Sequence, residues 1–194
     1  DGINILCIPD AAAHAESITI QKALIQHCLE MRDRFAILDS WRNVLPTGPG
    51  SVEEQRLMVS APNGFAALYY PWLVVPDPLA RGSQAATTTV PPSGHIAGIY
   101  ARTDNERGVH KAPANTDVRG VLGLEQRLTD GQQGPLNLEG INVLRIFPNS
   151  GQVTVWGART TVDPQTTDWQ YINVRRLMLY IEESIEEGIR WAVF

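Results

Sequence analysis

A group of charged residues in the middle of the sequence could form an active site. It lies where a helix capped by Ser93 is expected to end and a loop containing Pro113 to begin; its members are Arg102, Asp104, Glu106, Arg107, His110 and Lys111. Clustered titratable side chains of this kind could serve a hydrolase or a transferase. Two other interpretations are favoured over this one. The first is a solvated helix end with local ion pairs worth about 0–1 kcal/mol each. The second, favoured most, is a polar network that fixes a loop or a subunit contact.

Asp39 is a second candidate, because it ends an apolar segment that is expected to be a strand. Folds of the α/β class often place nucleophilic or metal-binding acids at this end of a strand. A single aspartate is a weak signal, and structural capping of the next loop is favoured. An enzyme therefore remains the alternative prediction, and it requires Asp39, Asp104 and His110 to converge in one pocket.

The sequence lacks the motifs of the common catalytic sites. Nothing matches GxxxxGK[ST], and the glycines at 48–50 lack the third glycine of a dinucleotide fingerprint. The four histidines form no HxxxH or HExxH pair, and no GxSxG elbow is present. We therefore expect no cofactor and no metal. His27 falls on the apolar face of the helix predicted at 19–32 and is expected to be a core histidine. The other residues of that predicted face are Ile20, Ala23, Leu24, Cys28 and Met31.

Composition narrows the class of protein. The 194 residues contain 16 Lys and Arg against 21 Asp and Glu, a net charge of −5, which argues against nucleic acid as the main partner. No apolar run approaches the roughly 20 residues that span a bilayer, so no membrane contact is expected. Cys7 and Cys28 lie in apolar segments and are expected to be buried free thiols, with a disulfide as the minority interpretation.

The elements expected to position these residues begin with a βαβ unit. A strand at 3–8, a helix at 19–32 and a strand at 35–38 imply a parallel pair with helices packed on a sheet. Ser51 and Glu54 have capping-box spacing, so a helix should start near Val52. A strand at 65–70 should continue beyond Pro71 only as an edge or bulged segment, because proline has no N–H to donate. Residues 81–92 form a predicted loop and the best internal boundary.

The second half of the chain ends in a hairpin and a helix. Residues 131–135 are expected to form a turn, and 141–147 with 152–156 a β-hairpin joined by 148–151. A long helix should follow from Val174 to Phe194, with Asn173 as its N-cap. Its apolar stripe should dock on the core, and its charged residues should form an exposed ridge. The stripe is Val174, Leu177, Met178, Ile181, Ile185, Ile189 and Ala192; the ridge is Arg175, Arg176, Glu182, Glu183, Glu186, Glu187 and Arg190. The predicted fold class is α/β: a mixed sheet built from βαβ units flanked by helices, with a C-terminal hairpin followed by a long amphipathic helix.

Four segments resemble one family, the tail sheath proteins of contractile phage tails and related contractile injection systems. They are residues 31–39, 91–115, 140–161 and 169–194, and residues 69–78 fit as well. The resemblance implies a structural, non-enzymatic subunit. Such subunits stack as helical rings around an inner tube, and contraction drives the tube through a target envelope.

The resemblance also implies partners and a location. The partners would be copies of the chain, an inner tube protein, and baseplate and terminator proteins. The protein would belong to a virion tail or a phage-tail-like particle assembled in the cytoplasm of a bacterial or archaeal host. Residues 1–117 would be the first part of the sheath core, and 118–194 its C-terminal part, packed as one compact unit. The extended terminal arms that lace neighbours together in this family are expected to be absent from the chain.

Two groups of residues then become contact hypotheses. Four acids on the charged ridge are expected to face the inner tube or a neighbouring subunit in the extended state; they are Glu182, Glu183, Glu186 and Glu187. Four members of the mid-chain charged group are expected to fix the loop through Pro113 and to lie at a subunit contact; they are Arg102, Asp104, Arg107 and Lys111. The alternative for the acids is a merely solvated helix face.

Overall fold

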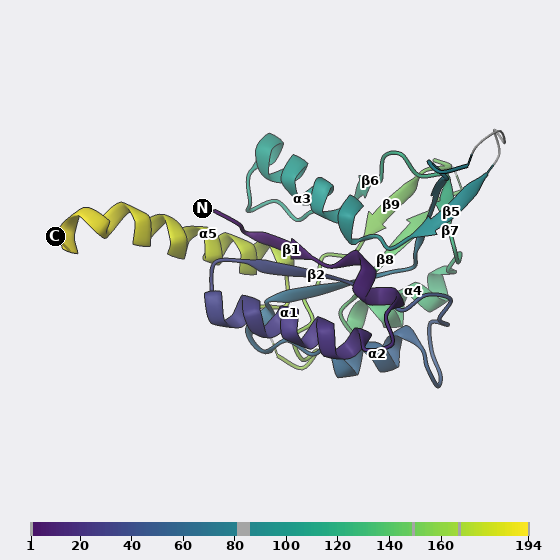
Figure 1. Ribbon diagram of the computed structural model, residues 1–194, viewed down its shortest axis with the longest axis horizontal. Helices are drawn as coiled ribbons and strands as arrows, with labels where there is room; N and C mark the ends of the chain where they lie inside the picture. The colour runs from purple at the N-terminus through teal and green to yellow at the C-terminus, as the bar shows by residue number, and fades with distance from the viewer. Residues whose placement is uncertain (1, 81–85, 149, 167, 194) are drawn as a thin grey trace.

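The computed structural model describes residues 2–80, 86–148, 150–166 and 168–193. A six-stranded sheet with the order β1-β2-β3-β8-β9-β6 forms the body, and a three-stranded sheet β5-β4-β7 lies at one end (Figure 1). The strands are β1 Ile5–Cys7, β2 Phe35–Asp39, β3 Ala66–Tyr70, β4 Leu73–Pro76, β5 Thr87–Val90, β6 Thr116–Asp117, β7 Gly123–Leu124, β8 Ile141–Ile146 and β9 Val153–Trp156. The α-helices are α1 Ser17–Met31, α2 Val52–Met58, α3 Ser93–Arg107, α4 Asp130–Leu138 and α5 Ile172–Ile189.

The predicted βαβ unit is confirmed. β1 and β2 pair in parallel with Ile5 opposite Phe35, and α1 connects them. β3 and β8 extend the parallel set, and β9 then turns back antiparallel to β8 as the predicted hairpin. Of the turn predicted at 148–151, residue 149 lies outside the described residues. The sheet is therefore mixed, and the predicted α/β class is correct.

The core follows from this topology. β2 and β3 are buried at every position, as expected for parallel strands covered on both faces. In Figure 1, α1 and α2 lie on one side of these strands and α3 on the other. The predicted cap of α2 is confirmed: the Ser51 hydroxyl accepts a hydrogen bond from Glu54 N at 3.2 Å. The Glu54 carboxylate accepts one from Gly50 N at 2.6 Å.

Two loop predictions are wrong. Residues 87–90 of the predicted loop 81–92 form β5, since a run of threonine and valine suits a strand; residues 81–85 lie outside the described residues. The predicted edge or bulged continuation beyond Pro71 is also wrong, because the chain leaves the main sheet there and β4 is the central strand of the second sheet. The predicted turn at 131–135 is part of α4, which the capping box of Thr129 and Gln132 begins.

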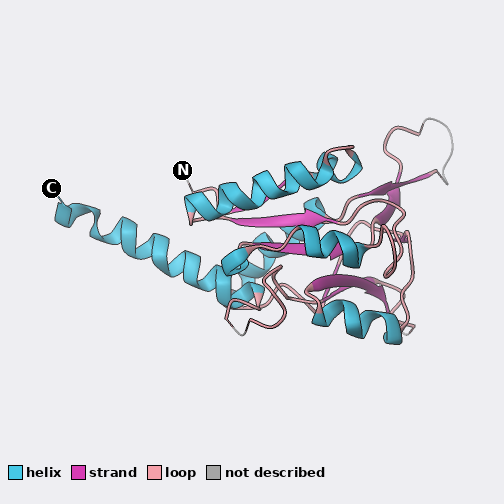
Figure 2. Cartoon of the chain, turned by 90° about the horizontal axis from the view of Figure 1, so that it is seen from below, coloured by secondary structure: helices cyan, strands magenta, loops and turns pink. Residues whose placement is uncertain are grey.

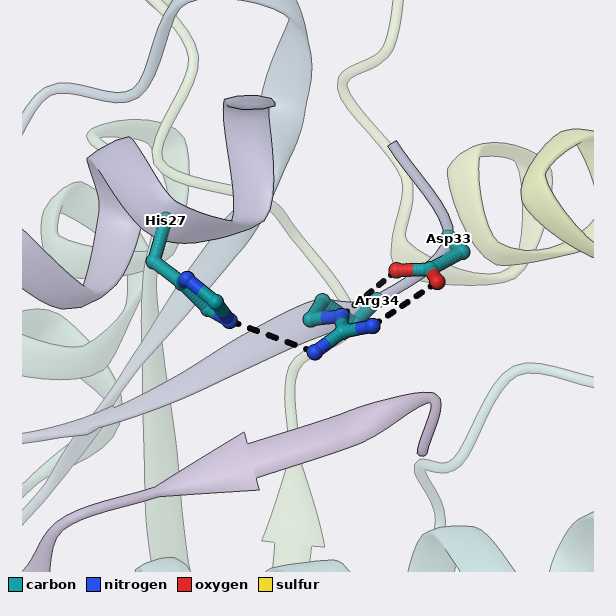
Figure 3. A network of polar contacts seen from close by, with 3 residues as sticks. All are labelled: His27, Asp33 and Arg34. Carbon is teal, nitrogen blue, oxygen red and sulfur yellow. Dashed lines mark hydrogen bonds and ion pairs between the residues drawn. The ribbon is translucent and has the colours of Figure 1, made fainter. Parts of the chain in front are cut away.

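His27 is also predicted wrongly. The buried face of α1 is rotated from the predicted one and carries Gln21, Leu24, Ile25 and Cys28, so His27 is exposed. Its Nε2 lies 3.2 Å from Nη1 of Arg34, whose guanidinium also contacts the Asp33 carboxylate (Figure 3). Both cysteines are free thiols; Cys28 is buried and Cys7 is half-buried.

The division at 117/118 stays a prediction. β8 and β9 come after it, yet they sit between β3 and β6 in one sheet. Within the described ranges, no helix combines the length and the apolar content needed to cross a bilayer.

Candidate functional site

The most distinctive surface of the molecule is the outer half of α5. Figures 1 and 2 both show this helix leaving the body, with the C-terminus at its far end. Its root is buried through Ile172 and Leu179, whereas from Tyr180 to Ala192 only Glu183 is even half-buried. A short 3-10 turn, η3 Arg190–Val193, ends the described chain; Phe194 of the predicted helix lies outside the described residues.

The prediction that the apolar stripe docks on the core is therefore wrong over most of its length. Ile181, Ile185 and Ile189 are 38%, 57% and 53% exposed. Their spacing of four residues does place them on one face of the helix. The face has no partner among the described residues, because the helix extends beyond the sheet that covers its root (Figure 2).

Two arginines of the predicted exposed ridge are instead buried at the root of α5. The guanidinium carbon of Arg175 lies 4.0 Å from the centroid of the Phe65 ring and 4.6 Å from that of Trp169. Aromatic faces attract such a cation, and the attraction increases when water is excluded. Burial lowers the pKa of the Arg175 guanidinium. The side chain thus packs α5 against Phe65, the residue just before β3.

Arg176 fastens the helix to α3. Its Nη1 and Nη2 donate to Oδ1 and Oδ2 of Asp104 at 2.9 and 2.6 Å, a bidentate ion pair. The same guanidinium lies over the Tyr100 ring at 4.7 Å. The hydroxyl of Tyr100 is 2.9 Å from that of Tyr69 in β3, and burial raises the pKa of both phenols. The network runs from the sheet through α3 to α5.

The predicted mid-chain group is not brought together as one unit. Asp104 faces Arg176, while Arg102 Nη2 donates to the carbonyl of Asp117 at 3.2 Å. The backbone carbonyl of His110 accepts from Nδ2 of Asn173, which is inside α5 and not its N-cap. Arg107 and Lys111 are exposed. A subunit contact for this group stays a prediction.

Asp39 has a structural position. It is buried at the end of β2, and its Oδ1 accepts from Ser93 N, the first residue of α3, at 2.7 Å. The predicted role of Ser93 as a cap is wrong, since Asp39 caps the helix. Burial raises the pKa of the Asp39 carboxyl to about 7, and the hydrogen bond from Ser93 N acts in the opposite direction.

This geometry gives the enzymatic alternative no support. Asp39 contacts α3 at Ser93, the first residue of the helix. Asp104 lies eleven residues further along the same helix, about 16 Å away along its axis. In the part of the chain that the structure describes, His, Cys, Asp and Glu side chains nowhere gather in threes that could hold a metal ion.

The four acids of α5 line a hollow of about 400 Å³ at the side of the helix. Its other walls come from the N-terminus of the chain and from the turn after α1; the complete lining is Gly2, Met31, Arg32, Asp33, Glu182, Glu183, Glu186, Glu187 and Arg190. The acids therefore face the turn after α1 at least in part. A contact with a tube or a neighbour stays a prediction.

Sequence patterns could not reveal the role of Arg175 and Arg176. Both stand beside apolar residues on a helix whose hydrophobic stripe lies elsewhere, and their partners are distant in the sequence. The one available signal is that Trp169 precedes the helix, so that an aromatic ring is near an arginine at the helix start.

The described residues form an α/β protein with a mixed sheet and a projecting helix, whose exposed apolar face is of the kind that marks protein contact sites. Comparison with known proteins specifies the family. The family model described as phage tail sheath protein central domain matches residues 1–161. The chain belongs to the phage tail sheath family.

Individual relatives agree with this assignment. The chain is 27% identical over 152 residues to a Pseudomonas aeruginosa (strain UCBPP-PA14) protein named as a prophage major tail sheath protein, covering 75% of the chain and 38% of that protein. It is similar to the PVC sheath of an extracellular contractile injection system in the contracted state: TM-score 0.80, 35% identity, 100% of this chain and 49% of that one. The contracted helical sheath of the anti-feeding prophage matches with TM-score 0.77 and 35% identity, over 99% of this chain and 48% of that one. The chain thus spans less than half of each relative.

Proposed function

We propose that this chain is the core of a structural subunit that polymerises as helical rings around an inner tube and contracts to drive the tube through a target envelope. The observation that carries the proposal is the 35% identity, over the whole chain, to a contractile sheath in its contracted state. The role is geometric, and no chemical step on a substrate is part of it.

The partners follow from the same similarity. Copies of the protein would form the sheath, and one matched structure of the anti-feeding prophage is a baseplate, which supports a baseplate contact at the end of the sheath. The inner tube and the terminator are further proposed partners. The particle would be a phage tail or a phage-tail-like device assembled in the cytoplasm of its host.

The outer half of α5 is the proposed contact surface within this assembly. It combines exposed isoleucines with Trp191, which is 80% exposed. Contiguous exposed apolar side chains mark sites of protein–protein contact. Residues 1–117 and 118–194 are proposed to be the two parts of one sheath core.

Negative-stain electron microscopy of the full-length protein, with and without its tube protein, tests the function. We expect regular tubes of uniform width, because a sheath subunit carries self-complementary surfaces that close on copies of itself. A protein that stays monomeric in both samples would be a binding module of another kind.

Reversing the charges of Glu182, Glu183, Glu186 and Glu187 to lysine tests the acidic ridge. We expect fewer assembled extended sheaths, because the change replaces four negative charges on the projecting helix. The thermal midpoint of the monomer should change little, since three of the four acids are exposed and exposed charges contribute little to stability. Extended sheaths in normal number would show that these acids form only a solvated face. The same reversal at Glu53 in α2 is a control for a general effect of added positive charge.

A further inference from the structure

The direction of α5 depends on its root. From Ser184 to Ala192 every described side chain is exposed, so among the described residues no buried contact holds this part of the helix to the body. Buried contacts occur only at Ile172, Arg175, Arg176 and Leu179. The position of the apolar face of α5 is therefore decided some distance away from that face.

Two neighbouring arginines hold the root on two sides. Consecutive residues of an α-helix point about 100° apart around its axis. Arg175 accordingly reaches Phe65 and Trp169, whereas Arg176 reaches Tyr100 and Asp104 on α3. The buried Ile172 and Leu179 hold the root by apolar contact. Two polar contacts at this angle add a restriction on both tilt and rotation.

The Asp104 contact differs from the others in its geometry. A bidentate pair fixes the plane of the guanidinium, because two parallel N–H···O bonds must form together. Cation–π contacts tolerate sliding over the ring, and apolar contacts tolerate more. Among the groups at the root, the Asp104 carboxylate has the strictest directional requirement.

Small changes at the root become large at the tip. Arg176 and Ile189 are thirteen residues apart, about 20 Å along the axis. A tilt of roughly 10° at the root would then move Ile189 by about 3 Å. Such a displacement exceeds what a packed apolar contact accepts without rearrangement.

We propose that Asp104 is a positioning residue that, by holding Arg176, sets the direction in which α5 presents its apolar face. The biological meaning of this inference rests on the proposed function, since the direction of α5 matters when neighbouring subunits must meet it. The direction itself is a property of the single chain and can be measured without assembly.

Stability alone is a weaker explanation of the pair. Arg176 is buried and Asp104 is half-buried. Replacing an ion pair that is largely removed from water by apolar residues of similar size is often neutral or stabilising, whereas removing one partner is costly. The double variant D104L/R176M therefore separates the two roles, because it leaves no buried charge unpaired. It should melt within a few degrees of the unaltered protein yet hold α5 less strictly.

Distance measurements between two spin labels test the direction. Labels at Lys22→Cys on α1 and Glu187→Cys near the tip of α5 report the angle, in a Cys7→Ser background that leaves only the buried Cys28. We expect one narrow distance distribution in the parent protein and a broader one in D104L/R176M, with its mean moved by about 3 Å or more. D104E keeps a carboxylate and should restore a narrow distribution. A second pair, Lys22→Cys with Arg127→Cys, should be unaffected by either change.

Two results would overturn the inference. The first is an unaltered narrow distribution in a folded D104L/R176M; should that variant not fold, the same result in D104N is equally decisive. The second comes from the full-length protein: ordered tubes built by a variant with a loosened α5 would show that its direction does not matter. Tube formation by the parent protein in the same experiment keeps the proposed function separate from this outcome.

Discussion

Replacing Asp39 by asparagine is expected to stabilise the protein above pH 7 by about 4 kcal/mol at most and to leave its stability near pH 4 unchanged. Asp39 is buried at the end of β2, and burial raises its pKa from an ordinary 3.8 to about 7. The hydrogen bond from Ser93 and the N-terminus of α3 favour the ionised form of the Asp39 carboxyl. The loss of hydration, which favours the neutral form, is the larger effect. The protein therefore holds a carboxyl group that resists ionisation.

The direction of the effect follows from proton binding. Between pH 4 and 7 the unfolded chain has already lost the proton of Asp39, whereas the folded chain retains it. Raising the pH through this range therefore favours unfolding, and the full cost is reached above pH 7. Asparagine carries no such proton, and its side-chain oxygen can still accept the hydrogen bond from Ser93 N. The benefit of the substitution should thus grow from pH 4 to 7.

Urea unfolding of both proteins at several pH values between 4 and 8 measures this difference. Asp10→Asn is the matched control, because it removes the same charge from an exposed position. A stability difference for Asp39→Asn that is the same at pH 4 and at pH 8 would show that Asp39 ionises normally in the folded protein. A loss of stability at every pH would show that the carboxylate itself is the required cap.

The elements that sequence patterns predicted well are those fixed by local chemistry. The apolar β1 and β2, separated by a helix, could form little other than a parallel pair. The cap of α2 is equally local, because Ser51 accepts from Glu54 N only three residues away. The hairpin of β8 and β9 is similarly local. These features need no knowledge of the rest of the chain.

The errors arise where distant segments decide the outcome. Asp39 caps α3 from 54 residues away, and Asp104 pairs with Arg176 across 72 residues. The apolar stripe of α5 has the expected helical period, but the period of a sequence does not reveal whether another segment covers the stripe. The buried face of α1 differs from the predicted one and includes Gln21, whose amide donates to the carbonyl of Asp39. Tertiary contacts, not propensities, determined the candidate site.

Replacing Ile185 by aspartate is expected to prevent sheath assembly while changing the stability of the monomer by no more than about 0.5 kcal/mol. Ile185 is 57% exposed and lies at the centre of the face formed with Ile181 and Ile189. A substitution there removes no buried contact among the described residues, so the monomer should fold as before. In an assembly that covers this face, the same change would bury an unpaired carboxylate, which costs several kcal/mol at every copy of the interface.

Ser184→Asp is the control, since it adds the same charge one residue earlier, about 100° around the helix. Ser184 is exposed, and its hydroxyl bonds only to the carbonyl of Tyr180 within α5. Tube counts by electron microscopy should fall at least tenfold for Ile185→Asp, the effect of about 1.4 kcal/mol per contact, and much less for Ser184→Asp. Equal loss in both variants would mean that added negative charge inhibits assembly wherever it lies on α5. Normal tubes from Ile185→Asp would mean that the apolar face is not a contact surface, because the free-energy cost of the substitution would recur at every copy of the interface in the sheath.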